Sequence, residues 1–403
     1  MLKFLRGPLA FVTATMFLNF AGLTIIIPVI PYIVQEYTPH VALYVGLIMS
    51  VAALCQFISS PTLGYLSDIY GRRPILLWSL VGGMIGFVVF GIGGALWVLF
   101  LGRIIDGLTA GDTPAMYAYI ADVSAPSDRA RLYGILGAAG GFGFLVGPAI
   151  GGFAAQLSLS APLYVAAVLS LINALWGYFV MPESLKEEHR VKKFEVKHLN
   201  PFRQFSHVFT SEALRVLFIA TFFFFIALIM QQSNISVFLK DVLLWGPTQI
   251  GIVLTVVGAV DIASQGYLTG KLLPRWGEKM LALVGLVITA LGMILVGSVA
   301  FLPSGVLLYI AVIIYTLGDG LFEPAMSGLI SNATEAHMQG RIQGANQGTQ
   351  SIARVIAPLI AAALYEWAAY LPYFSSALIM VAVLAILLVF GSMLKSANRS
   401  ATA

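Results

Sequence analysis

Charged residues are scarce along the whole of this 403-residue chain. Asp, Glu, Lys and Arg make up 10% of the residues, whereas a soluble domain carries about 25%. Hydrophobic residues make up 59%, and the mean hydropathy is +0.92. This composition excludes an ordinary soluble domain and indicates that lipid surrounds most of the chain. The formal net charge of +4 is too small to indicate a nucleic-acid partner.

Cysteine and histidine are rare as well. The single cysteine, Cys55, lies in an apolar segment, which excludes a disulfide framework and a cysteine-based metal site. The five histidines fall at loops or at the ends of apolar segments, so no metal site and no cofactor are expected. A membrane enzyme would need a nucleophile with a base, or a phosphate-binding loop of the form GxxxxGK(S/T), and the sequence offers neither. We therefore expect that the protein is not an enzyme.

Long apolar runs take the place of these features. A transmembrane helix needs about 20 mainly apolar residues, and twelve segments meet this requirement. They span residues 8–34, 42–66, 75–95, 97–122, 131–156, 160–181, 214–240, 247–271, 279–300, 305–331, 342–367 and 372–394. The first segment is far longer than a signal-peptide core of about 7–15 residues. The sequence therefore predicts an all-α membrane protein with twelve transmembrane helices.

Lysine and arginine mark one side of the predicted membrane. The opposite loops carry one basic residue, Lys240. The basic side contains both termini, the long connection 183–213, and Arg72, Arg73, Arg129, Arg131, Lys271, Arg275, Lys279 and Arg341. Because basic loops stay in the cytoplasm, we expect both termini to be cytoplasmic, with the protein in the cytoplasmic (inner) membrane of a bacterium.

The two halves of the chain repeat each other. The tripeptide PAM occurs at Pro114–Met116 and again 210 residues later at Pro324–Met326, and the same offset relates Ile120, Asp122, Arg131, Gly134 and Pro148 to residues 330, 332, 341, 344 and 358. This series predicts a duplication, with pseudo-symmetric six-helix bundles at residues 1–182 and 214–403 and a cytoplasmic linker at 183–213. Internal repeats are typical of secondary transporters, which bind substrate near the midplane.

Three motifs connect this pattern to a known family. The stretch GYLSDIYGRRP, residues 64–74, follows the second span, LGRIIDGLTAGDTPA lies in the fourth, and GGFGFLVGPAIGG, residues 140–152, lies in the fifth. The small residues of the last motif permit close approach of helices. Over essentially the whole chain these motifs resemble the major facilitator superfamily, specifically its twelve-helix drug/proton antiporters of the tetracycline and multidrug efflux type.

The resemblance implies roles for several residues. It assigns Arg103 to the fourth-helix arginine that is tied to proton transfer, and it makes Asp122 the partner of Arg72. The gating residues that it implies are Asp68, Gly71, Arg72 and Asp122 in an interhelical latch, and Gly147, Pro148, Gly151 and Gly152 in the fifth helix.

The sequence also departs from the tetracycline exporters. Those proteins usually carry an acid in the first helix where Asn19 stands here, and acids near the places of Gly86 and Thr289. Asp261 stands about where some of them have a histidine. The run YTLGD, residues 315–319, is closer to some multidrug members. These departures argue against tetracycline itself as the substrate.

Seven ionisable residues fall inside predicted spans, where charge is costly and by default marks function. They are Arg103, Asp106, Asp112, Asp261, Asp319, Glu323 and Arg354. Five acids against two bases leave an excess of carboxyl groups that can take up protons. From this set we predict proton-coupling roles for Asp319, Glu323, Arg354, Asp261, Arg103 and Asp112.

Asp319 is the leading candidate for the proton carrier. It is central in its span, and Arg354 on the next span is the one cation at that depth in its half. Glu323 and Tyr315 lie one turn away on the same helix face, and Pro324 cannot bond back to the Gly320 carbonyl. The alternative is that Asp319 and Arg354 form a buried pair that only fixes packing.

Polar residues in the spans are candidates for orienting a substrate. We predict substrate contacts for Asn19, Gln56, Asp106, Gln231, Asn234, Gln265, Tyr315, Asn346 and Gln350.

The expected function is proton-driven export of amphipathic small molecules or drugs by alternating access. Two alternatives stay open, a dedicated exporter of a metabolite such as a siderophore or a lipid-like compound, and a non-transporting sensor with the same fold. The expected partners are a small-molecule substrate, protons and membrane lipid, without nucleic acid, and a monomer is expected.

Overall fold

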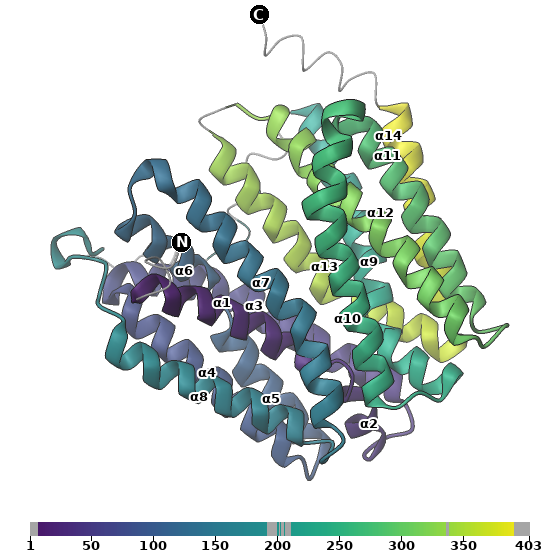
Figure 1. The fold of residues 1–403 in the computed structure, drawn as a ribbon, viewed down its shortest axis with the longest axis horizontal. Helices are drawn as coiled ribbons and strands as arrows, with labels where there is room; N and C mark the ends of the chain where they lie inside the picture. The colour runs from purple at the N-terminus through teal and green to yellow at the C-terminus, as the bar shows by residue number, and fades with distance from the viewer. Residues whose placement is uncertain are drawn as a thin grey trace, which may run out of the picture. The chain divides into compact units, whose positions relative to one another are not determined.

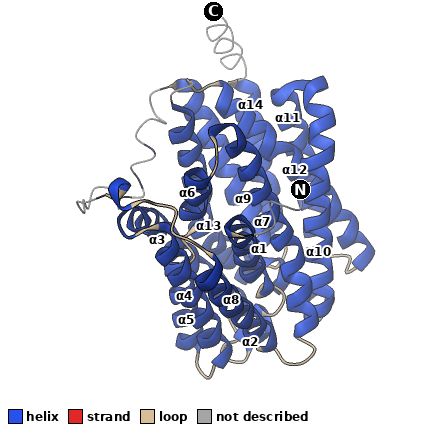
Figure 2. Cartoon of the chain, turned by 60° about the vertical axis from the view of Figure 1, so that its left-hand side comes forward, coloured by secondary structure: helices blue, strands red, loops and turns tan. Residues whose placement is uncertain are grey.

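The computed structural model of the chain describes residues 7–191, 200, 202, 205, 211–335 and 338–390. Within these residues the regular elements are helices, and no strand occurs (Figures 1 and 2). Eight helical segments of the described chain are long and apolar enough to cross a membrane. Shorter apolar helices accompany them, and the predicted fold class, an all-helical membrane protein, is confirmed. Residues 192–199 and most of 201–210, within the predicted linker, lie outside the described residues.

Two compact units divide the described chain. The first consists of Met1–Pro39, Val51–Pro201 and Gly246–Thr255, and the second of His40–Ser50, Phe202–Trp245 and Val256–Ala403. Each unit thus takes most of one sequence half and a short piece of the other. Two helices, α3 (Val41–Tyr70) and α10 (Pro247–Ala263), pass from one unit into the other along their length.

The first half of the chain forms the helices up to α8. Besides α3 they are α1 (Pro8–Ile25), α2 (Ile30–Gln35), α4 (Arg72–Ile92), α5 (Leu96–Thr109), α6 (Thr113–Val123), α7 (Pro126–Ala154) and α8 (Ala161–Val180). A short 3₁₀ turn, η1 (Glu187–His189), follows α8.

The second half continues with α9 (Glu212–Leu243) and α10. A π-helical turn, η4 (Ser264–Leu268), joins α10 to α11 (Thr269–Ser298), and the last helices are α12 (Gly305–Asn332), α13 (Gln339–Trp367) and α14 (Leu371–Val389). In the second unit α9 packs on α13 and α14, and α11 packs on α12 and α14. The buried acid of this half, Asp319, lies on α12.

A proline divides the fourth predicted span into α5 and α6. Pro114 has no backbone N–H, so the Ala110 carbonyl lacks its usual helical donor. The side-chain amide of Gln56 on α3 donates to this carbonyl at 3.0 Å, and the Ser59 hydroxyl donates to the Gly107 carbonyl at 3.1 Å. The break is therefore stabilised by side chains of a neighbouring helix.

The second half repeats the side-chain support of backbone carbonyls near a proline. Here the helix itself, α12, continues through Pro324 without a break. The Gly320 carbonyl, which Pro324 leaves without a donor, accepts a hydrogen bond of 2.9 Å from the Thr269 hydroxyl. The Ser264 hydroxyl donates to the Leu317 carbonyl at 3.0 Å. Ala110 and Gly107 precede Gly320 and Leu317 by the same 210 residues that relate the two PAM tripeptides. The two sequence repeats thus share hydrogen bonds from neighbouring side chains to equivalent backbone carbonyls.

Tight glycine turns recur in the two halves. Gly71, between α3 and α4, has φ 106° and ψ 160°, and Gly277, within α11, has φ 71° and ψ 165°. A residue with a side chain rarely adopts a positive φ. The eighth and ninth predicted spans are therefore separated by a sharp turn at Gly277, where the sequence had predicted a loop over residues 272–278.

Glycines on α7 allow it to pack closely on α1. A Cβ atom added at Gly143, Gly147 or Gly151 would collide with the backbone of α1 near residues 17, 21 and 25. The spacing of four residues places these glycines on one helix face. Gly152 and Pro148, from the same motif, lie against the first turns of α10, where the Thr248 hydroxyl donates to the Gly152 carbonyl at 3.0 Å.

Candidate functional site

The predicted latch residues come together around Arg72 at the start of α4. Its guanidinium lies 2.6 Å from the Asp68 carboxylate and 3.3 Å from that of Asp122, and it also donates to the Ser67 hydroxyl at 2.6 Å. The side chain of Arg72 is only 9% exposed, so the two acids compensate a largely buried charge. The predicted contact of Arg72 with Asp122 is present in the structure.

Glu183 is a member of this cluster that the sequence reading missed. Its carboxylate accepts hydrogen bonds from the backbone N–H groups of Arg72 at 2.9 Å and Arg73 at 3.2 Å, and from those of Ser184 and Leu185. The first turn of α4 leaves such N–H groups without intrahelical partners, and an acid there is favoured by the helix dipole. A signal was available, since Glu183 is the first acid after the sixth span.

Asp112 is the most deeply buried acid of the first unit. It is 1% exposed and lies at the break between α5 and α6. The Asn19 amide on α1 donates to its two carboxylate oxygens at 2.9 and 3.2 Å. Asn19, which stands where tetracycline exporters usually have an acid, therefore binds the buried acid of the opposing helix.

Arg103 and Asp106 form an ion pair within α5. The guanidinium lies 2.6 Å from the Asp106 carboxylate, and the two side chains are 3% and 15% exposed. The close packing of α4 on α5 occurs at glycines, because a Cβ atom at Gly86 would collide with Asp106 and with the Gly102 carbonyl. Of the two acids predicted inside the fourth span, Asp106 is thus compensated by a cation, and Asp112 has a neutral partner.

The second unit gathers three acids and one arginine near the middle of α12. Asp319 is 8% exposed, and Asp261 from α10 and Glu323 one turn along α12 lie within electrostatic range of it. The Asp261 carboxylate accepts a hydrogen bond of 2.9 Å from Gln265. Gly320 makes this approach possible, since Asp261 and Ser264 lie where a larger side chain would project. We call Asp261, Asp319, Glu323 and Arg354 the acid cluster.

The structure does not show the buried pair of Asp319 and Arg354 that the sequence left open as an alternative. Arg354 lies within electrostatic range of Glu323, and among the ion pairs of the described residues none joins Arg354 to Asp319. The side chain of Arg354 is exposed. One oxygen of Asp319, Oδ1, is buried and has no hydrogen-bond partner among the described residues. Of the three acids, Glu323 is thus the one near the arginine, and no ion pair of the described residues joins a cation to Asp319 or Asp261.

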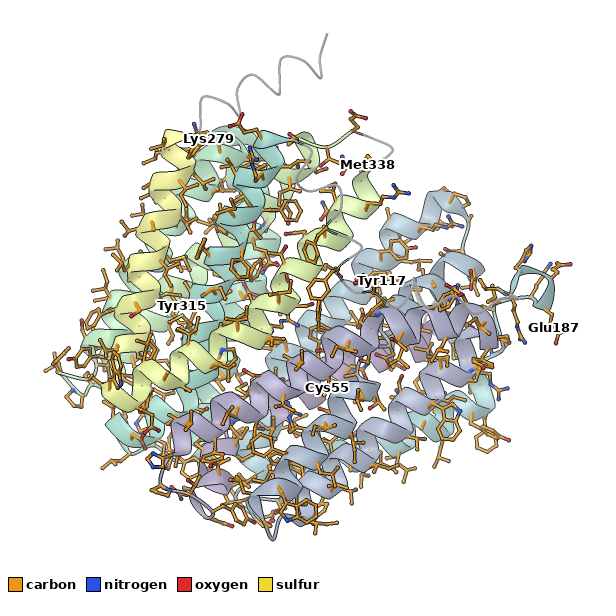
Figure 3. All side chains as sticks on the ribbon, turned by 180° about the vertical axis from the view of Figure 1, so that it is seen from behind. Cys55, Tyr117, Glu187, Lys279, Tyr315 and Met338 are labelled. Atoms are coloured by element: carbon orange, nitrogen blue, oxygen red, sulfur yellow. The ribbon has the colours of Figure 1, made fainter. Side chains whose placement is uncertain are left out.

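Other predicted substrate contacts of the second unit are buried. Tyr315 is 2% exposed and lies on α12 among the helices of its unit (Figure 3). Gln231 and Asn234 on α9 are 0% exposed, and Asn346 on α13 is 5% exposed. Gln350, one turn from Asn346, is half-buried. Gln56, in the first unit, instead uses its amide to support the Ala110 carbonyl.

Comparisons with known proteins agree with this arrangement. The family model of the Major Facilitator Superfamily matches residues 12–358 and also residues 217–402. A class C tetracycline resistance protein from Escherichia coli is 33% identical over 364 residues, covering 89% of this chain and 90% of that protein. Multidrug resistance protein 2 from Bacillus subtilis is 26% identical over 384 residues, covering 94% and 93%.

Solved structures are similar in fold. A D-xylose–proton symporter matches with a TM-score of 0.74 and 17% identity over 94% of this chain and 96% of that chain. The human organic anion transporter MFSD10 matches with a TM-score of 0.70 and 20% identity over 94% and 98%. The helical fold with its buried acids is that of a membrane transporter. The chain belongs to the Major Facilitator Superfamily.

Proposed function

We propose that the protein is a proton-coupled exporter of amphipathic small molecules, working by alternating access in the cytoplasmic membrane of a bacterium. Both termini are cytoplasmic in this proposal, residues 183–213 link the two repeats on the same side, and the working unit is a monomer. The acid cluster is the observation that carries the proposal. Three carboxyl groups, one buried and two half-buried, lie near one guanidinium, and ionisable groups inside a membrane by default mark function.

The proposed exchange follows from the positions of these groups. Asp319 binds a proton, because a carboxylate without a cation is strongly disfavoured in a buried site. In this proposal the substrate binds beside Glu323, which is half-buried, and Arg354, which is exposed. Substrate and proton then compete for the same excess of negative charge, which makes their exchange obligatory. The excess of acids favours cationic or neutral substrates.

The similar proteins and Asn19 bear on which class of substrate is exported, tetracycline or a range of drugs. Tetracycline is one candidate, because tetracycline resistance proteins are among the similar sequences. A multidrug substrate range is the other, because multidrug resistance proteins match over a larger part of the chain. The neutral Asn19 and the TLGD sequence around Asp319 favour the second.

Inside-out membrane vesicles provide the test. Vesicles that contain the protein are energised so that their lumen becomes acidic, and a pH-sensitive fluorescent dye reports the gradient. Addition of tetracycline or ethidium is expected to release luminal protons only when the protein is present. If neither these two probes nor a broad panel of amphipathic compounds causes proton release, the proposal is wrong.

A further inference from the structure

A stripe of three polar residues and one phenylalanine on α9 lies outside the acid cluster. Gln231, Asn234, Phe238 and Asp241 follow one another at intervals of three, four and three residues, which places them on one face of the helix. The first three are 0% exposed, while the Asp241 side chain, near the helix end, is 41% exposed. Ten residues of helix span about 15 Å, half of a hydrocarbon core of about 30 Å. The stripe therefore runs back from the last turn of α9 over a length of about half a hydrocarbon core.

Several polar atoms along this stripe are buried without partners. Among the described residues, no hydrogen bond is made by the side-chain nitrogen or oxygen of Gln231 and Asn234, or by the Tyr373 hydroxyl. Gln231 lies beside the Tyr315 hydroxyl, but not in the geometry of a direct hydrogen bond. Buried groups of this kind usually bind internal water, because leaving them unsatisfied is costly. The region is thus suited to hold ordered water molecules.

Three tyrosines from α12, α13 and α14 complete a connection along the stripe. The Tyr365 hydroxyl donates to the Asp241 carboxylate at 3.0 Å. The Tyr373 ring packs on Phe238 with centroids 4.6 Å apart, and Tyr373 lies within electrostatic range of both Tyr365 and Tyr315. Tyr315 in turn lies within electrostatic range of Asp319, one turn away on α12. The hydrogen bond of Tyr365 with Asp241 marks one end of a series of polar groups, and the one-turn spacing of Tyr315 and Asp319 marks the other, with Tyr373 in electrostatic range of both tyrosines.

We propose that Asp241, Tyr365, Tyr373 and Tyr315, with water held by Gln231 and Asn234, form a proton path from the outer end of α9 to Asp319. The proposal rests on the proposed antiport and on the proposed orientation, in which this end of α9 faces outward. Each hydroxyl or water accepts a proton on a lone pair and gives its own proton to the next group. The Asp319 carboxylate receives the last proton, and every tyrosine ends in the state in which it began.

The entrance to the path has an identifiable set of charges. Lys240 lies 3.1 Å from Asp241, and Glu366 lies within electrostatic range of Tyr365 while bonded to His40 at 3.0 Å. Asp241 is the acid that contacts a path tyrosine directly, whereas Glu366 is bonded to a histidine. This difference provides a matched pair of acids for an experiment.

The variants remove one path group at a time with little change in volume. Tyr373→Phe and Tyr365→Phe each delete only a hydroxyl, and Asp241→Asn replaces an acid with an amide. Their controls are Tyr309→Phe, a tyrosine of α12 that packs on Trp245, and Glu366→Gln. Each is measured in inside-out vesicles with tetracycline and with ethidium, in two modes, uptake driven by an acidic lumen and exchange of labelled for unlabelled probe without a gradient.

The two modes separate proton delivery from folding and substrate binding. Because a lost proton-transfer group typically slows transfer by 10²-fold or more and water replaces part of it, we expect driven uptake to fall about tenfold in the path variants. Exchange, which needs no net proton transfer, is expected to stay near the wild-type rate, as are both modes in the controls.

Equal loss of driven uptake and exchange in the path variants would show a structural role, and unchanged driven uptake would show that protons use another route; either overturns the proton path. A wild-type protein that moves neither these probes nor any compound of the broad panel, with or without a gradient, contradicts the antiport itself, and the path with it. If the wild-type protein shows antiport and the path variants show the same driven uptake as the wild type, only the proton path is contradicted.

Discussion

The amide of Asn19 donates hydrogen bonds of 2.9 and 3.2 Å to the two carboxylate oxygens of Asp112. This contact joins α1 to the break between α5 and α6, where Asp112 is 1% exposed. A buried acid is expensive unless it is hydrogen-bonded. Asn19 therefore stabilises the acid of the fourth span without adding a second charge.

Replacement of Asn19 by Leu is expected to destabilise the protein. A buried polar group that loses its partner costs about 1–3 kcal/mol, and more when it is charged. The double variant Asn19→Leu/Asp112→Leu removes both groups and should recover much of the loss. Thermal unfolding of the detergent-solubilised variants measures both effects. Equal instability of the single and double variants would show that the hydrogen bonds contribute little.

The latch around Arg72 predicts a difference between two adjacent arginines. Arg72→Ala leaves Asp68 and Asp122 without their cation, and we expect transport to be lost with a stability cost of about 1–3 kcal/mol. Arg73→Ala removes a more exposed side chain that donates to the Tyr178 carbonyl at 2.6 Å, and it should change transport much less. Uptake by vesicles with matched amounts of protein tests this, and similar losses in both variants would contradict it.

The glycines of α7 predict that the effect of a Gly→Ala substitution on thermal stability depends on its position in the helix. Gly147→Ala and Gly151→Ala place a Cβ atom against the backbone of α1, and overpacking typically costs about 1–3 kcal/mol. Gly141→Ala, on the same helix, meets open space, and alanine favours the helix by about 1 kcal/mol over glycine. Melting temperatures should therefore fall for the first two variants and stay level or rise for the third.

The Gly320 carbonyl, which Pro324 leaves without a backbone donor, predicts that substitutions of Thr269 and Pro324 have coupled effects on stability. Thr269→Val removes the hydrogen bond to the Gly320 carbonyl and should cost about 1 kcal/mol. In a Pro324→Ala background the N–H of the new alanine can bond to that carbonyl, so the same threonine change should cost much less. A double-mutant cycle on thermal stability measures the coupling. Additive effects would mean that Thr269 does not compensate for Pro324.

Much of the fold could be predicted because its signals can be read along the sequence without knowing how the helices pack. Apolar length located the spans, and the 210-residue offset located the two proline sites. The neighbour of Arg354 could not be predicted, because counting from span ends gives depth in the membrane but not the direction in which a side chain points. For the same reason the supports Thr269 and Ser264 and the contact of Tyr365 with Asp241 were not found: each depends on how separate helices pack.

The measurement that tests the central claim most directly is gradient-driven transport by Asp319→Asn. The amide cannot take up and release a proton, so accumulation of a transported probe in inside-out vesicles should be lost, and an uncoupler should have no further effect. Asp128→Asn, at the exposed start of α7, is the matched control and should behave as the wild type. Uncoupler-sensitive accumulation by Asp319→Asn at the wild-type rate would contradict the assignment of Asp319 as the proton carrier.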